Sequence, residues 1–93
     1  MMLNPGDGVI LLGDATTHGG RVISGQARYQ VNGKPVAVVG DKVSCPKKGH
    51  GVCSIVEGHP TITLDGIPVA FHGCHTSCGA KLISASGGRH GLG

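Results

Sequence analysis

Short apolar runs separated by glycine-containing turns are the main pattern in this 93-residue chain. In residues 61–64 hydroxyl and apolar side chains alternate, which places the apolar ones on one face of a strand. The longest purely aliphatic run, residues 9–12, is far too short to cross a membrane. The pattern therefore predicts many short strands rather than helices.

Two stretches of the chain, residues 25–40 and 58–73, align with each other without a gap. They share their end glycines, a central glycine and a Pro-Val-Ala sequence. An Asn-Gly pair at 32–33 and an Asp-Gly pair at 65–66 stand at the centres, and such pairs favour the type I′ turn of a β-hairpin. Each stretch is therefore predicted to form a hairpin.

A third, shorter copy opens the chain, because residues 9–14 match residues 36–41 and 69–74. After each copy and its loop the chain returns to an aliphatic segment, at residues 21–25, 53–58 and 81–84. We expect one all-β domain over residues 1–86, cone-shaped and built from three strand–loop–strand units with pseudo-threefold symmetry. The loops would meet at its apex, and a Gly-rich flexible tail would follow at 87–93.

Composition narrows the function classes. The chain has 18 Gly, 2% aromatic residues and a formal charge of only +3, so the basic, aromatic surface of a nucleic-acid-binding protein is not expected. No basic residue precedes the early aliphatic run, so we expect no signal peptide and a cytosolic protein, unless a signal-independent machine exports it. In that compartment four Cys and six His favour a metal site over disulfides.

Metal-ligating residue types recur at equivalent places in the three loops. Four residues beyond the turn position of each unit stand His18, Cys45 and Cys78. The second loop has a longer insertion, in which His50 offers a fourth donor. Two Cys and two His are a usual donor set of a closed structural zinc site. One zinc ion would link three loops that have little apolar interior of their own.

The third loop leaves the donor set open, because Cys74 or His75 could replace one of the four. Cys53 lies in an aliphatic return segment and is expected to be a core thiol. A Cys–His pair could in principle serve a covalent enzyme. However, only five acidic residues are present, no helix is predicted that could lower a thiol pKa, and the metal would occupy the site. We therefore expect no catalysis.

Five short motifs follow one another along the chain in a specific order and spacing. They are Gly13-Asp14-x-x-x-His18-Gly19-Gly20, Pro35-Val36-Ala37-x-x-Gly40-Asp41-x-x-x-Cys45-Pro46, Gly49-His50-Gly51, Pro68-Val69-Ala70 and Cys78-Gly79-Ala80. Together they resemble the PAAR-repeat family over about residues 8–86.

The resemblance implies a cone whose base caps VgrG, the trimeric β-helical spike of a type VI secretion system. It implies a zinc-bound apex, with His18, Cys45, His50 and Cys78 as ligands, that sharpens the spike for membrane puncture. Cys74 departs from the residues usual at its position, so it stays an alternative. One copy would cap one trimer, with effector or adaptor proteins as further partners and no stable membrane insertion. The type VI apparatus would export it outside or into a target cell. The competing hypothesis is a stand-alone zinc-binding interaction module.

Overall fold

The computed structural model describes residues 8–31, 33–46 and 51–84. These residues form eight short strands and no helix, so none of them makes a helix able to cross a membrane. The strands are β1 Ala15–Thr16, β2 Gln26–Val31, β3 Lys34–Val36, β4 Lys42–Cys45, β5 Gly51–Ser54, β6 Thr63–Leu64, β7 Ile67–Pro68 and β8 Leu82–Ile83. They pair antiparallel as β1–β8, β2–β3, β4–β5 and β6–β7. The all-β prediction is confirmed.

A closed ring of backbone hydrogen bonds joins the three units. The Ile10 N–H donates to the Ala70 carbonyl at 2.9 Å, and the Ala37 N–H donates to the Ile10 carbonyl at 2.9 Å. The Ala70 N–H donates to the Ala37 carbonyl at 3.0 Å and completes the ring. These residues occupy the same position in the three aligned copies and are fully buried. The ring therefore marks the predicted pseudo-threefold axis.

Two further sets of strand contacts repeat around this axis. The inner set joins the aligned copies, as the pairs Leu11–Val36, Val38–Val69 and Phe71–Val9. The outer set joins each return segment to the loop strand of the next unit, as the pairs Val22–Val43, Ile55–Thr76 and Leu82–Thr16. No unit pairs only with itself, so the three units stabilise one another.

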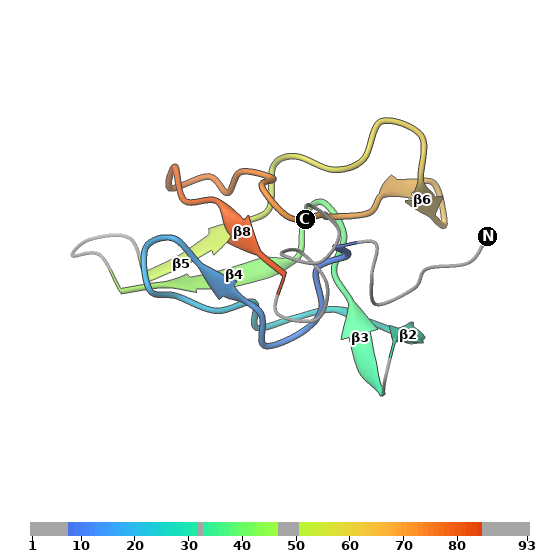
Figure 1. The fold of residues 1–93 in the computed structure, drawn as a ribbon, viewed down its shortest axis with the longest axis horizontal. Coiled ribbons are helices and arrows are strands. Elements are labelled where there is room, and N and C mark those ends of the chain that lie inside the picture. The colour runs from blue at the N-terminus through green and yellow to red at the C-terminus, as the bar shows by residue number, and fades with distance from the viewer. Residues whose placement is uncertain (1–7, 32, 47–50, 85–93) are drawn as a thin grey trace.

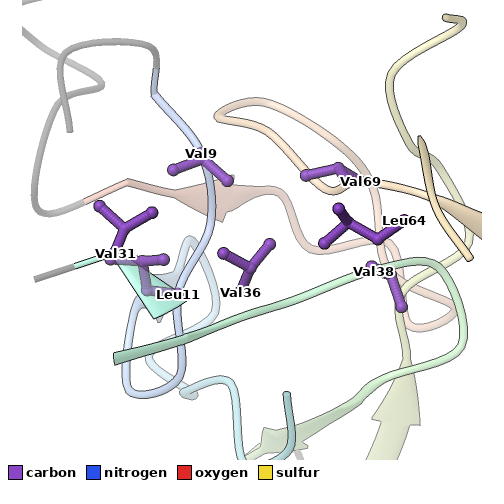
Figure 2. Packing of buried hydrophobic residues seen from close by; sticks show 7 residues of the cluster. All are labelled: Val9, Leu11, Val31, Val36, Val38, Leu64 and Val69. Atoms are coloured by element: carbon purple, nitrogen blue, oxygen red, sulfur yellow. The ribbon is translucent and has the colours of Figure 1, made fainter. Parts of the chain in front are cut away.

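Alternation along the aligned copies divides the interior into two apolar layers. The base layer contains Val9, Leu11, Val31, Val36, Val38, Leu64 and Val69 (Figure 2). The apical layer contains Ile10, Val22, Ala37, Val43, Ile55, Ala70 and Leu82. All are aliphatic, as a chain with 2% aromatic residues requires.

The two ends of the body differ in structure (Figure 1). The hairpins β2–β3 and β6–β7 lie at one end, whereas β4–β5 and the loop before β8 lie at the other. In the β6–β7 turn Asp65 and Gly66 have φ of 52° and 81°, as the predicted type I′ turn requires. Gly33 has φ of 78° in the β2–β3 turn, while Asn32 lies outside the described residues.

Candidate metal centre

The first loop is shaped by the buried Thr16 at the end of β1. Its Oγ1 accepts hydrogen bonds from the N–H groups of His18 at 3.3 Å and Gly20 at 3.1 Å. Its own N–H donates to the Gly20 carbonyl at 3.0 Å. These bonds close a tight turn with His18 at its tip. The His18 side chain is half-buried.

The third loop repeats this turn around Thr76. The Thr76 N–H donates to the Ala80 carbonyl at 2.8 Å, and the Gly79 N–H donates to the Thr76 carbonyl at 3.0 Å. Gly79 has φ of 86° and Gly19, its counterpart in the first loop, has φ of 85°. Cys78 therefore stands at the tip of the third loop, where His18 stands in the first.

The second loop is built differently, as the β4–β5 hairpin. Cys45 is the last residue of β4 and pairs with Gly51, the first of β5. Because side chains alternate along a strand, Cys45 shares a face with Val43, which is fully buried in the apical layer. The Cys45 thiol is thereby directed to the inner side of the hairpin, where it is 5% exposed.

The three loops bring their donors together at the apex. The ligand atoms of His18, Cys45 and Cys78 all lie within 4.8 Å of one another. The Cys78 Sγ lies 3.9 Å from the His18 Nδ1. His50, predicted as the fourth donor, lies outside the described residues.

Cys78 has an environment that favours its charged form. Burial alone raises the pKa of the Cys78 thiol, but hydrogen bonds with Thr76, Cys53 and Cys45 lower this pKa to about 5. The Thr76 Oγ1 lies 3.2 Å from the Cys78 sulfur. Since the thiolate is the form that ligates metals, Cys78 is prepared as a ligand at neutral pH.

The predicted alternatives in the third loop are placed elsewhere. The Cys74 thiol accepts the N–H of Phe71, and burial raises the pKa of Cys74. The carboxylates of Asp14 and Asp41 accept the corresponding N–H groups in the first and second copies, at 2.9 and 2.8 Å. Cys74 thus closes the turn of the third copy as these aspartates close the turns of the first two. It also packs against the apical layer.

His75 is engaged with Glu57 on the surface. The His75 N–H and ring Nδ1 both contact the Glu57 Oε1, at 2.7 and 2.5 Å. These hydrogen bonds lower the pKa of Glu57. Neither Cys74 nor His75 belongs to the donor cluster that the described residues form.

Cys53 is the residue whose position sequence reasoning missed. It is buried, at 8% exposed, as expected of a core thiol. However, it forms a hydrogen bond with Cys78, and this bond and burial raise the pKa of Cys53 to about 11. It comes from β5, and its place beside the third loop depends on pairing between units.

One imidazole nitrogen and two sulfurs from three loops suit a metal ion that prefers nitrogen and sulfur donors. The donors are close enough together to hold a metal ion. Three protein donors and one further ligand would complete tetrahedral coordination.

The model of a protein family described as the PAAR motif matches residues 12–84. The matched stretch contains His18, Cys45, His50 and Cys78. No curated protein matches the chain.

Proposed function

Because the chain belongs to the PAAR-motif family, we propose that it forms the tip of a type VI secretion spike, with one copy capping one VgrG trimer. Proteins with this motif are known as structural tip proteins of such spikes, which supports the general role. The hydrogen-bonded ring of Ile10, Ala37 and Ala70 is the observation that carries the proposal. A single chain with this pseudo-threefold axis can present similar surfaces to all three subunits of a trimer.

The hairpin end is the proposed docking surface. Tyr29 and Phe71 are the chain's only aromatic residues apart from its histidines, and both pack against the base layer while remaining partly exposed. A hollow of about 440 Å³ lies between the two hairpins, and the Tyr29 hydroxyl crosses to Asp65 at 3.1 Å. Partly exposed aromatic and aliphatic groups beside a hollow suit a protein interface.

At the opposite end, His18, Cys45 and Cys78 would hold a structural zinc ion, with His50 as fourth ligand. Zinc has no redox chemistry of its own, so its contribution would be cohesion of the three loops. Binding free energy at such a site becomes folding free energy. A metal-stiffened apex suits a tip that has to pass through a membrane without inserting stably.

Two extensions go with this role. Effector or adaptor proteins would ride on the tip, and the protein would be cytoplasmic until the apparatus exports it. His18, Cys45 and Cys78 would serve the metal, so we propose no catalytic role. A stand-alone zinc-binding module is the alternative that the following experiment separates.

The test is co-purification with a trimeric VgrG spike. Native mass spectrometry should find three spike chains with one copy of this protein. Ile67→Asp, at a 40% exposed site on β7, should abolish the complex, because it places a charge at the docking end. Val52→Asp, at a 60% exposed site on β5 near the apex, is the matched control and should bind normally. Absence of any wild-type complex, or equal loss in both variants, would overturn the capping role.

A further inference from the structure

The Cys53–Cys78 contact lies beside the proposed metal centre but outside its donor set. The two thiols form a hydrogen bond with each other. Two hydrogen bonds hold the neighbouring residues together: the Ser77 N–H donates to the Ser54 carbonyl at 2.8 Å, and the Ser54 N–H donates to the Ser77 Oγ at 3.0 Å. The hydrogen bonds between Ser54 and Ser77 therefore hold the backbone at Cys53 beside the backbone at Cys78.

The pair is also reachable from solvent. A surface hollow of about 360 Å³ is lined by Val52, Cys53, Ser77 and Cys78. Cys45 contacts Cys78 too, but it does not line this hollow. A small oxidant that enters the hollow therefore reaches Cys53 and Cys78 together. Both cysteines are free thiols in the structure.

We propose that Cys53 and Cys78 form a reversible disulfide when the apex lacks metal and a peroxide is present, so that Cys53 controls whether the apex can hold metal. This inference rests on the proposed role of Cys78 as a ligand. Cys53 is then a resolving thiol and not a ligand itself.

The chemistry balances with hydrogen peroxide as the oxidant. The sulfur of Cys78 attacks one peroxide oxygen, the O–O bond breaks, and a sulfenic acid and one water result. The sulfur of Cys53 then attacks the sulfur of Cys78, forms the S–S bond and displaces a second water. The two thiols lose two electrons and two protons in total, and the peroxide is reduced to two waters.

The disulfide and the metal exclude each other. A metal ligand must be a thiolate, and a sulfur in a disulfide has no thiolate to offer. Bound zinc conversely occupies the Cys78 sulfur and shields it from peroxide. With Cys78 oxidised, His18 and Cys45 alone would remain of the three donors that the structure brings together.

The test uses the full chain, first stripped with a chelator and then treated with one equivalent of hydrogen peroxide. After alkylation of free thiols, trypsin and a glutamate-specific protease separate Cys53 from Cys78, because Glu57 lies between them and Lys48 precedes both. Fragmentation then distinguishes Cys78 from Cys74 within the partner peptide. We expect a Cys53–Cys78 linked pair with Cys74 alkylated. Zinc at ten times its Kd should slow formation about tenfold, since only about one molecule in eleven is then metal-free.

Variants separate this inference from the proposed metal site. Cys53→Ser should still bind one zinc and form no linked pair, and Cys74→Ser should oxidise like the wild type. Linkage of Cys78 to Cys45 or Cys74, or an unreacted Cys53, overturns the disulfide. Loss of zinc from Cys53→Ser also overturns it, because Cys53 would then be a ligand. Failure of the wild type to bind zinc contradicts the proposed metal role instead.

Discussion

The base and apical layers, here called the axial layers because they surround the pseudo-threefold axis, and the loops at the apex share one threefold arrangement. They are held together by different forces. Around the axis, Ile10, Ala37 and Ala70 are fully buried, and a backbone hydrogen bond joins each of them to the next. In the loops, His18 and Cys78 are only half-buried, and backbone turns around polar Thr residues fix their positions. Burial of apolar surface stabilises the layers. The loops have little such surface, so a metal shared by their donors would add to the backbone hydrogen bonds that join them.

The first prediction concerns truncation of a buried side chain at the pseudo-threefold axis. Ile10→Ala should lower the free energy of unfolding by about 2–5 kcal/mol, because it leaves a cavity in the apical layer. The loss should be similar with zinc and with chelator, since the axial layers do not depend on metal. Urea denaturation in both conditions measures it.

Ile23→Ala is the control, because Ile23 is 48% exposed and should contribute much less. Equal losses in the two variants would contradict the assignment of the core to the axial layers.

The second prediction removes two donors. Cys45→Ser combined with Cys78→Ser should abolish zinc binding and lower the melting temperature. At free zinc a hundredfold above Kd, the lost stabilisation is about 2.7 kcal/mol. Metal analysis and thermal melts measure the two effects, and most of the difference from wild type should vanish in chelator.

Cys74→Ser is the matched control, since Cys74 closes a turn and does not join the donors. It should bind one zinc. Unchanged zinc content in the double variant would refute the donor set.

The third prediction compares the first loop with the third. A Cβ at Gly20 would lie 1.8 Å from the Ser44 carbonyl oxygen, which belongs to β4 and cannot move aside cheaply. Gly20→Ala should therefore cost about 1–3 kcal/mol and weaken zinc binding by displacing His18. The third loop has Ala80 at this place, and Ala80→Gly should cost about 1 kcal/mol or less. Chemical denaturation of both variants measures the loss in free energy of unfolding. Equal losses in the two variants would contradict this prediction.

The smallest expected effect concerns the surface pair of Glu57 and His75. Hydrogen bonds from His75 lower the pKa of Glu57 in the folded state. The pair therefore stabilises the fold above the unfolded pKa of Glu57, and this contribution is lost as pH falls through the folded pKa. Melting of wild type and Glu57→Gln in chelator should show a small deficit for the variant at pH 7 that disappears at low pH. A deficit that grew on acidification would contradict the sign.

Much of the fold could be predicted because each unit carries local signals. Gly13, Gly40 and Gly73 have φ of 92°, 96° and 92°, so the glycines that align in sequence adopt one conformation. The gapless alignment of residues 25–40 with 58–73 likewise anticipated the two hairpins.

Individual side-chain contacts, both within a unit and between units, were harder to predict. In the alignment Cys74 occupies the position of Asp14 and Asp41. Only the hydrogen bond from the Phe71 N–H explains why a thiol can replace a carboxylate at this position. The meeting of Cys53 with Cys78 depends on the bonds between Ser54 and Ser77, which join two different units. Local patterns carry no information on such a register.

Amide hydrogen exchange with and without zinc tests most directly whether metal holds the apical loops. The Thr16 and Thr76 amides close the first and third turns, so zinc a hundredfold above Kd should slow their exchange on the order of a hundredfold. The Leu64 and Ile67 amides, in the two-residue strands β6 and β7 at the opposite end, open locally without releasing the metal and should exchange unchanged. Unaltered exchange in the two loops, or equal slowing at both ends, would contradict the account.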